Sequence, residues 1–353
     1  MDCILEAIGG TPLVRLERYL EAPGFSLLAK LESFNPAGSS KDRPALAILD
    51  HGRRSGAIRP DTVVIESSSG NMGIGLAQAC RYFGLRFICV VDPKASALNL
   101  SIMRAYGADV ELVTAPDPVS GEWLPARLAR VQQLLREIPG AFWSNQYSNA
   151  ANPESHYRTT MAEVAESLGG KLDFVFIATS TCGTIRGCGN YLRDHRLPTR
   201  LVAVDAVGSQ IFDRGDVAED PSARRLIPGL GAGLRPQLCD PALVDRVVHV
   251  TDVECVCACR RLVRREAILA GGSAGGVLAA VEKLRGWIPA GSVCVAILPD
   301  RGERYLDTIF DDTWVYEHLG LREEPAGSAS TVGRCAVVSY PGRPPEVGAG
   351  LPR

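Results

Sequence analysis

A lysine near the start of the chain follows a turn of small and polar residues, where its amine could act as a nucleophile. Residues 35–41 read Asn-Pro-Ala-Gly-Ser-Ser-Lys, and residues 44–53 predict a helix soon after Lys41. The positive field at a helix N-terminus disfavours the ammonium form of a nearby lysine, and a partly desolvated amine is a usable nucleophile. Because an isolated lysine usually lies on the surface, Lys41 is a candidate for covalent catalysis only in combination with other features.

Three segments rich in glycine, serine and threonine could bind an anionic ligand. They are residues 66–73, 180–184 and 271–276. The first two follow β-branched runs that predict strands. In an open α/β sheet, ligands bind at the carboxyl ends of the strands, beside helix N-termini whose free N–H groups favour anions. Each segment alone could be an ordinary turn, but together they predict an anion-binding site.

The same segments lack the fingerprints of two common nucleotide sites. None has the Gly-x-Gly-x-x-Gly spacing of a dinucleotide site with an acidic residue about 20 positions further on. None ends in the Gly-Lys-Ser/Thr of a P-loop. Dinucleotide and nucleoside triphosphate binding are therefore not predicted, which leaves chemistry at Lys41.

The order of predicted elements indicates an α/β fold. Short β-branched runs alternate with amphipathic stretches over residues 62–113, and the alternation resumes over residues 174–298. This pattern predicts two open, parallel-type twisted sheets covered by helices. The expected domains are residues 1–42 as the start of a large domain, 43–145 as a small N-terminal α/β domain, 146–321 as the rest of the large domain, and 322–353 as a disordered tail. The tail holds five prolines and five glycines without a sustained period.

The composition is that of a soluble globular protein. Of the 353 residues 46% are hydrophobic, and 38 Lys and Arg against 40 Asp and Glu give a net charge of −2. This balance gives no electrostatic reason to expect nucleic acid or an anionic membrane as a partner. The N-terminus lacks the pattern of a signal peptide, and no segment approaches the roughly 20 apolar residues of a membrane span. We therefore expect a cytoplasmic protein.

Eleven scattered cysteines, mostly in apolar runs, predict buried free thiols. The densest group is Cys255, Cys257 and Cys259. On a helix, Cys255 and Cys259 share a face while Cys257 points elsewhere. We therefore predict packing for this group and no metal site.

The lysine turn and the glycine-rich segments, in this order along the chain, resemble a known enzyme family. Residues 35–43 read Asn-Pro-Ala-Gly-Ser-Ser-Lys-Asp-Arg, residues 68–73 Ser-Ser-Gly-Asn-Met-Gly and residues 271–276 Gly-Gly-Ser-Ala-Gly-Gly. They resemble the cysteine synthase and cystathionine β-synthase family, the fold-type II pyridoxal phosphate enzymes. Further family landmarks lie at residues 8–14, 150–153, 227–231 and 298–305. The resemblance runs from about residue 8 to residue 319 and implies a tryptophan synthase β-like fold, pyridoxal 5′-phosphate as cofactor, amino-acid substrates and a homodimer.

The resemblance also implies roles for single residues. Lys41 would hold the cofactor covalently, Asn71 would hydrogen-bond the 3′-oxygen of its ring, and Ser273 would face its pyridine nitrogen. The cofactor phosphate would be bound by Ser180, Thr181, Cys182, Gly183 and Thr184. The substrate would be bound by Ser67, Ser68, Ser69, Gly70, Gln146, Tyr147, Gly229 and Arg301. A hydroxyl opposite the ring nitrogen, unlike a carboxylate, does not hold that nitrogen protonated, which suits β-elimination better than transamination.

One position departs from the family pattern. Many cysteine synthases have more glycine in the phosphate loop than this chain has in residues 180–184. If the loop needs a positive φ at residue 182, Cys182 would be strained.

Several shorter stretches indicate one branch of the family. They are residues 91–94, 145–149, 155–157, 202–206, 298–302 and 312–314. They resemble the branch that joins O-phospho-L-serine and L-glutamate with release of phosphate, the first step toward 2,3-diaminopropionate for siderophores and related natural products. The implied mechanism has Lys41 remove the Cα proton before phosphate leaves and the glutamate amine adds.

Charge gives modest support for this branch. A phosphorylated donor and a dicarboxylate nucleophile both need cationic surroundings, which sulfide does not. The candidate cations are Arg301, Arg235 and Arg43, and Tyr147 and His156 could line the pocket of the second substrate. The alternatives that stay open are an O-acetylserine or O-phosphoserine sulfhydrylase and a cystathionine β-synthase-like enzyme. A scaffold that has lost catalysis is a third alternative, against which the presence of Lys41 argues.

Overall fold

Two sheets with covering helices organise the first 304 residues. The computed structural model describes residues 1–212, 225–322 and 336–337. Residues 1–304 form one unit, which holds both sheets, and residues 305–353 form a second unit. The predicted fold class is confirmed, and the one antiparallel strand of the larger sheet is an addition to it. The predicted boundaries at residues 42 and 145 stay predictions.

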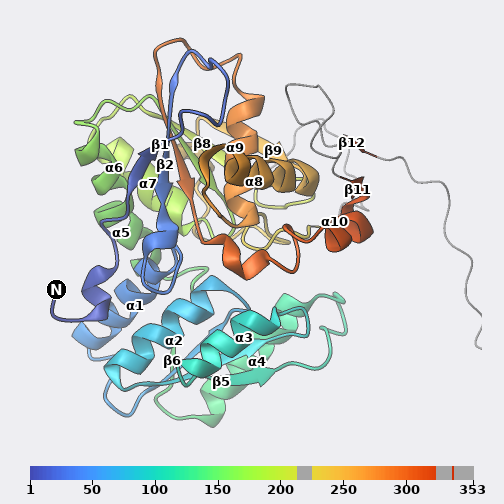
Figure 1. The fold of residues 1–353 in the computed structure, drawn as a ribbon. Helices are drawn as coiled ribbons and strands as arrows, with labels where there is room; N and C mark the ends of the chain where they lie inside the picture. The colour runs from blue at the N-terminus through green and yellow to red at the C-terminus, as the bar shows by residue number, and fades with distance from the viewer. Residues whose placement is uncertain (213–224, 323–335, 338–353) are drawn as a thin grey trace, which may run out of the picture. The chain divides into compact units, whose positions relative to one another are not determined.

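The smaller sheet follows the predicted βαβαβ pattern (Figure 1). Its parallel strands lie in the order β5 (Asp109–Leu112), β4 (Arg86–Val91), β3 (Val63–Ser67) and β6 (Phe142–Trp143). Its helices are α1 (Asp42–Arg54), α2 (Asn71–Phe83), α3 (Ala97–Ala105) and α4 (Trp123–Glu137). Successive side chains of β4 face opposite sides, so Phe87 packs in the core with α1 and α2 while Ile88 packs in a second core with Val131 of α4. Helices therefore cover both faces.

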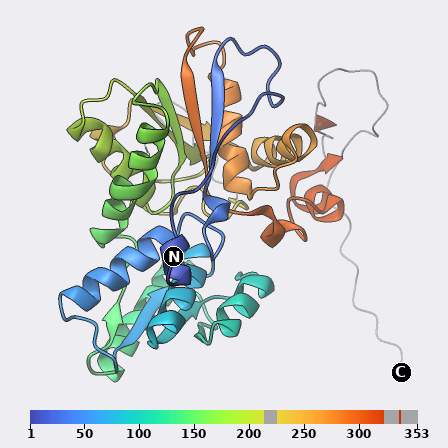
Figure 2. The same ribbon diagram turned by 60° about the vertical axis from the view of Figure 1, so that its left-hand side comes forward.

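The larger sheet has six strands. They lie in the order β1 (Leu13–Arg15), β2 (Ser26–Leu31), β10 (Val293–Leu298), β7 (Phe174–Ala178), β8 (Arg200–Ala206) and β9 (Arg246–Val250). Only β1 runs antiparallel within this sheet, and Figure 2 shows β2 beside β10, although these strands are far apart in the sequence. The helices are α5 (Ala151–Ser155), α6 (Ala162–Ser167), α7 (Gly183–Asp194), α8 (Asp252–Glu266) and α9 (Gly272–Lys283). The parallel strands place their carboxyl ends at one edge, where ligands bind in such sheets.

Short helical turns connect these elements. They are η1 (Ile4–Ala7), η2 (Glu32–Phe34), the π-helical turn η3 (His156–Met161), η4 (Pro241–Leu243) and η5 (Gly302–Tyr305). The second unit contains α10 (Asp312–Leu319) and a two-stranded antiparallel sheet of β11 (Leu321–Arg322) and β12 (Ala336–Val337). These two strands include three residues of the predicted tail, and the rest of that tail lies outside the described residues.

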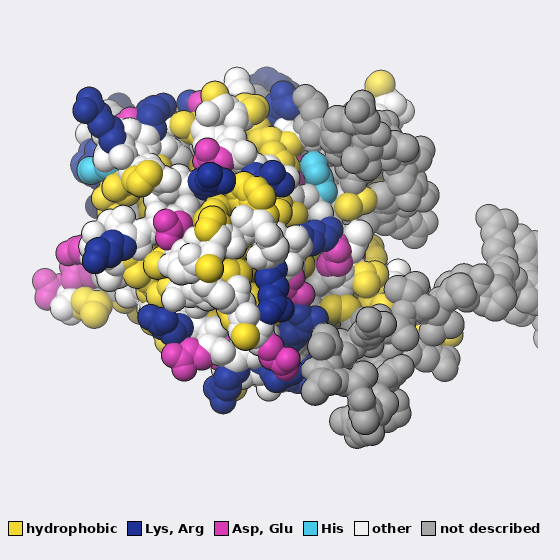
Figure 3. Space-filling view, turned by 90° about the horizontal axis from the view of Figure 1, so that it is seen from above, with side chains coloured by type: hydrophobic (Ala, Val, Ile, Leu, Met, Phe, Trp, Pro, Cys, Tyr) yellow, Lys and Arg dark blue, Asp and Glu magenta, His cyan; other side chains and the backbone are white. Residues whose placement is uncertain are grey.

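The cysteines and the surface add three findings. Nine cysteines of the described part are free thiols, among them the buried Cys255 and Cys259, whereas Cys257 is disulfide-bonded, which corrects the prediction that all thiols are free. Among the described residues, no group of three or more His, Cys, Asp or Glu side chains could hold a metal ion, and no helix is long and apolar enough to cross a membrane. On the face shown in Figure 3, Lys and Arg side chains are interspersed with Asp and Glu.

Candidate active site

Lys41 lies at the end of a tight turn between β2 and α1. The turn closes where Gly38 N donates to Asn35 O at 2.8 Å. Gly38 has a φ of +89°, and a Cβ at this position would lie 2.3 Å from Nε of Arg301. A larger residue would therefore displace the turn. The helix begins at Asp42, which makes Lys41 its N-cap residue.

Burial and the charges of several carboxylates act on the pKa of the Lys41 amine. Its Nζ donates to Ser40 Oγ at 3.4 Å. Burial lowers the pKa of Lys41, and the negative charges of Asp300, Glu32 and Asp42 partly offset this by raising it. A lowered pKa makes the neutral amine available nearer to neutral pH, as nucleophilic or base chemistry at Lys41 requires.

The loop after β7 presents the N-terminus of α7. No side chain caps this helix, so the N–H groups of its first turn have no partner within the helix. Gly183 packs closely on Asn152, because a Cβ on Gly183 would lie 2.0 Å from Asn152 Oδ1. Unpaired N–H groups, the helix dipole and the hydroxyls of the loop together suit a phosphate.

Cys182 is the strained position of this loop. It has a φ of +64° in the left-handed region, where a residue with a Cβ is disfavoured. The strain that the sequence predicts for Cys182 is therefore confirmed. The conformation turns the chain into α7 and aims the first N–H groups of the helix along one direction.

One cavity brings Lys41 and the phosphate loop together. It is lined by Lys41, by five residues of the loop and by Gly229, among others. The lining residues of the loop are Ser180, Thr181, Cys182, Gly183 and Thr184. An amine and an anion cradle thus face the same space, although 140 residues separate them in the sequence.

Asn71 and Ser273 lie at the first turns of two other helices. Asn71 is the first residue of α2, and Ser273 is the second residue of α9 and is 4% exposed. Both helices follow loops at the carboxyl edges of the sheets. Neither side chain lines the cavity of Lys41, so the roles implied by the resemblance stay predictions here.

Hydrogen bonds to a buried glutamate stabilise the loop after β3, which is predicted to bind the substrate carboxylate. Glu66 is fully buried, and it accepts hydrogen bonds from Ser144 Oγ at 2.7 Å and from Gln146 N at 3.0 Å. Burial raises the pKa of Glu66, although these hydrogen bonds act in the opposite direction. Gln146 Nε2 in turn donates to Ser67 O at 3.3 Å. The structure therefore joins Gln146 to Ser67, and the substrate-binding roles that the resemblance implies for these residues stay predictions.

Arg127 is a cation of this region that the sequence does not reveal. It belongs to α4, and its Nε lies 3.2 Å from the carboxylate of Asp92. This Nε is buried and has no acceptor in hydrogen-bonding geometry among the described residues. Burial raises the pKa of Tyr147, and the positive charge of Arg127 opposes that shift. No motif marks Arg127, since α4 carries several arginines.

The three arginines that the sequence offers as substrate cations have protein partners instead. Arg43 is 2% exposed and pairs with Glu32 and Glu163. Arg301 Nη2 donates to Ser33 O at 2.9 Å, and Arg235 Nε donates to Ile211 O at 2.8 Å. This geometry assigns Arg43 and Arg301 to the support of the Lys41 turn. A direct contact of Arg301 with substrate stays a prediction.

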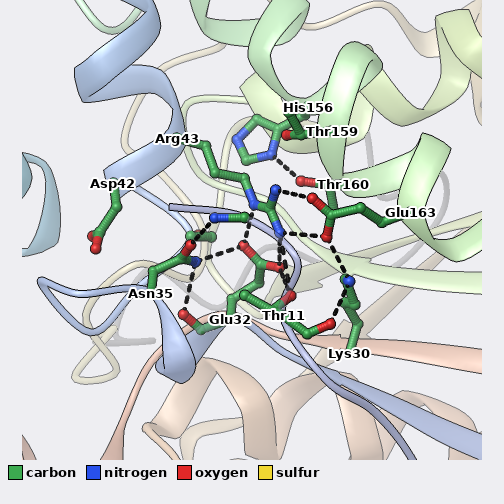
Figure 4. Close-up of polar contacts among 12 residues, drawn as sticks. Thr11, Lys30, Glu32, Asn35, Asp42, Arg43, His156, Thr159, Thr160 and Glu163 are labelled. Atoms are coloured by element: carbon green, nitrogen blue, oxygen red, sulfur yellow. Dashed lines mark hydrogen bonds and ion pairs between the residues drawn. The ribbon is translucent and has the colours of Figure 1, made fainter. Parts of the chain in front are cut away.

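His156 supports the phosphate loop from behind. Its ring is fully buried, with Nδ1 2.9 Å from Thr160 Oγ1 (Figure 4) and Nε2 3.2 Å from Thr184 Oγ1. Burial and the positive charges of Lys41 and Arg43 lower the pKa of His156 well below its usual range, so the ring is neutral. The sequence suggests His156 for the second-substrate pocket; the structure instead places it against the phosphate loop.

The tautomer of His156 follows from its partners. Among the described residues, the buried Thr160 hydroxyl contacts Nδ1, and we assign its proton to this contact. Nε2 then carries the ring proton and donates to Thr184 Oγ1. The Thr184 hydroxyl keeps its own proton free to donate into the cavity.

Comparison with known proteins places the chain in an enzyme class. Residues 4–300 match the family described as pyridoxal-phosphate dependent enzyme. The chain belongs to this family, and its cofactor is pyridoxal phosphate, as the resemblance implies.

Curated relatives narrow the class. The chain is 47% identical over 327 residues to N-(2-amino-2-carboxyethyl)-L-glutamate synthase of Cupriavidus metallidurans, a match that covers 92% of this chain and 94% of the relative. It is 46% identical over 328 residues to the enzyme of the same name from Ralstonia nicotianae, covering 93% and 95%. Among solved structures, O-ureido-L-serine synthase has a TM-score of 0.80 at 33% identity, covering 90% and 96%. O-acetyl serine sulfhydrylase isoform 3 of Entamoeba histolytica has a TM-score of 0.78 at 32% identity, covering 87% and 90%.

The support of the phosphate loop can be tested through cofactor affinity. His156→Phe keeps an aromatic ring but removes the donor to Thr184. We expect the dissociation constant for pyridoxal phosphate to rise about five- to tenfold, the cost of one neutral hydrogen bond. Fluorescence titration of the cofactor-free chain measures it. His51→Phe, an exposed position of α1, is the matched control; equal constants for the two variants would contradict a role for His156.

Proposed function

We propose that this chain catalyses a β-replacement that joins O-phospho-L-serine and L-glutamate to N-(2-amino-2-carboxyethyl)-L-glutamate and releases phosphate. The observation that carries the proposal is the cavity shared by the Lys41 amine and the anion cradle of α7, in a chain 47% identical to an enzyme named for that product. The product would serve the biosynthesis of 2,3-diaminopropionate for siderophores or related natural products.

The residues of the cavity fit the cofactor. The N-terminus of α7 and the hydroxyls of Ser180, Thr181 and Thr184 would hold the phosphate, and Lys41 would hold the aldehyde carbon. We assign Asn71 to the ring oxygen and Ser273 to the ring nitrogen on the family resemblance. When bound, the cofactor withdraws electrons from the substrate and so acidifies its Cα proton.

Lys41 would move the protons of the reaction. Its Nζ takes the proton from Cα of O-phosphoserine, and the Cβ–O bond then breaks so that phosphate leaves with the electron pair. The amine of glutamate forms a new bond to Cβ and loses a proton, and Cα regains one from Nζ. The lowered pKa of Lys41 suits this exchange, because a base acts best when its pKa lies near the working pH.

The substrates would lie along the loop after β3. Ser67, Ser68, Ser69 and Gly70 bind the carboxylate of the donor in this proposal. Gln146 and Tyr147 would lie on the side of the second substrate, and Arg127, although its Nε is paired with Asp92, would offer a guanidinium there. A dicarboxylate such as glutamate needs a cation there, whereas sulfide does not.

The glutamate site can be tested with a matched pair of variants on α4. Arg127→Gln should raise KM for glutamate about ten- to hundredfold, the loss of one charge-assisted hydrogen bond, and should leave the reaction with sulfide within about twofold. Arg130→Gln removes another arginine of α4, which pairs with Glu111 and Glu137 on the surface. This variant should change neither KM for glutamate nor the reaction with sulfide. Phosphate release from O-phosphoserine with each nucleophile gives both constants.

Two outcomes would contradict the assignment. Equal losses with glutamate and sulfide would make Arg127 a structural residue. Release of phosphate with sulfide alone in the unmodified enzyme would make the chain a sulfhydrylase, like the O-acetyl serine sulfhydrylase among its structural neighbours.

The assembly and location of the enzyme stay predictions. We propose a homodimer on the family resemblance, and the cytoplasmic location stays a prediction. Light scattering of the purified chain measures the first.

A further inference from the structure

The segment after β10 joins two of the motif loops of the active site. On one side, Ser40 N donates to Pro299 O at 2.7 Å. On the other side, Gly271 N donates to Asp300 O at 3.2 Å. The main chain of this segment therefore links the turn of Lys41 to the loop that precedes Ser273.

The side chain of Asp300 reaches the third motif. Asp300 is 1% exposed, and its Oδ2 accepts a hydrogen bond of 2.7 Å from Asn71 Nδ2. The other end of the amide, Asn71 Oδ1, accepts from the guanidinium of Arg304. A carboxylate can only accept and a guanidinium can only donate, so the Asn71 amide has a single orientation. One N–H of its Nδ2 goes to Asp300, which leaves the second for a ligand.

The charge of Asp300 also acts on Lys41. Of the three carboxylates that raise the pKa of Lys41, Asp300 has the largest effect, ahead of Glu32 and Asp42. Glu32 is paired with Arg43 at 2.7 Å, and Asp42 Oδ2 accepts from Ala37 N. The neighbouring His156 is neutral. An isolated β-bridge between Ser39 and Asp300 places Asp300 beside the turn of Lys41, so its charge is one of those that raise the pKa of the amine.

We propose that Asp300 is a positioning residue of this active site, which holds the Asn71 amide in one orientation and ties the turn of Lys41 to the loop of Ser273. It also stabilises the ammonium form of Lys41 and so sets the pH at which the amine becomes a base. The inference rests on the proposed function only for the roles of Lys41 and Asn71.

The charge effect is tested without any substrate. Asp300→Asn is nearly isosteric and removes the charge. Competitive labelling of amines across pH in the full-length, cofactor-free chain, followed by peptide mapping, gives the pKa of Lys41. We expect that pKa to fall by about one unit, which means about tenfold more neutral amine below the pKa. The control is Asp245→Asn. The carboxylate of Asp245 accepts from Leu201 N at the amino edge of the same sheet, so this variant should leave the pKa of Lys41 unchanged.

The orientation effect is tested by a double-mutant cycle. We expect Asp300→Ala, which removes the acceptor for Asn71 Nδ2, to weaken pyridoxal phosphate binding about tenfold in the natural chain and less than twofold in an Asn71→Ala background, since the two residues act as a unit. In the labelling experiment, Asp300→Ser, a smaller uncharged acceptor, replaces the asparagine variant if that variant does not fold. An unchanged Lys41 pKa together with additive losses would overturn the proposal. Because no amino-acid substrate is present, failure of the glutamate reaction would leave these results intact.

Discussion

Replacing Lys41 with alanine should lower the turnover of O-phosphoserine at least about a thousandfold. The residue is both the covalent anchor and the proton carrier of the proposed reaction, and positioned acid–base groups alone contribute about 10² to 10⁴. No other lysine lines the cavity among the described residues. The rate of phosphate release with glutamate measures the loss.

The matched control for this variant is Lys94→Ala, which removes an exposed lysine and should keep the natural rate. Borohydride reduction of the loaded enzyme and peptide mapping should find the cofactor fixed to Lys41. Attachment at Lys30 or Lys94, or a Lys41→Ala variant that keeps more than about a tenth of the rate, would contradict the assignment.

Replacing Arg43 with alanine should cost about 3–5 kcal/mol of the free energy of unfolding. Arg43 Nε lies 2.7 Å from Glu32 and Nη1 lies 2.6 Å from Glu163, while Lys30 Nζ lies 2.6 Å from Glu163 (Figure 4). The four charges are balanced and largely buried. Without Arg43, Glu32 would keep a buried charge with no cation, which is the costly way to break a buried pair. Urea unfolding followed by circular dichroism measures the loss.

An exposed pair provides the control for this stability effect. Arg158 pairs with Glu154 at side-chain exposures of 72% and 49%. Its replacement by alanine should change the free energy of unfolding by less than about 0.5–1 kcal/mol. If Arg43→Ala cost no more than Arg158→Ala, the buried network would not carry the stability we assign to it.

Much of the architecture can be predicted from the sequence. The alternation of short β-branched runs with amphipathic stretches defines both parallel sheets, because strands covered on both faces read as continuous apolar runs. The first two motif segments fall at strand ends as predicted. The β-branched run before residue 66 predicts a strand, and β3 continues beyond that run to Ser67. The polar Glu66 does not suggest a buried strand residue, because its burial depends on hydrogen-bond donors about 80 residues away in the sequence.

Other features depend on contacts that no local pattern records. Helix α4 carries a proline at Pro125 and many arginines, so its periodicity does not stand out, although proline is tolerated in a first helical turn. The sequence therefore misses the helix and, with it, Arg127. In the same way, Arg43 looks like a surface arginine until Glu163 of α6 is placed beside it.

The roles of His156 and Asp300 also depend on contacts between residues that are far apart in the sequence. The contact of His156 Nε2 with Thr184 forms only because η3 packs on α7. Asp300 lies within a stretch that the resemblance matches, but its link to Asn71 spans 229 positions. Long-range pairs of this kind require the fold.

The most direct test of the proposed reaction is a competition between nucleophiles. The purified enzyme would be given O-phosphoserine with equal concentrations of ¹⁵N-labelled glutamate and sulfide, and the products would be identified by mass spectrometry. We predict that the main product is N-(2-amino-2-carboxyethyl)-L-glutamate that retains the ¹⁵N label. Cysteine as the main product, with no ¹⁵N incorporated, would contradict the proposed function.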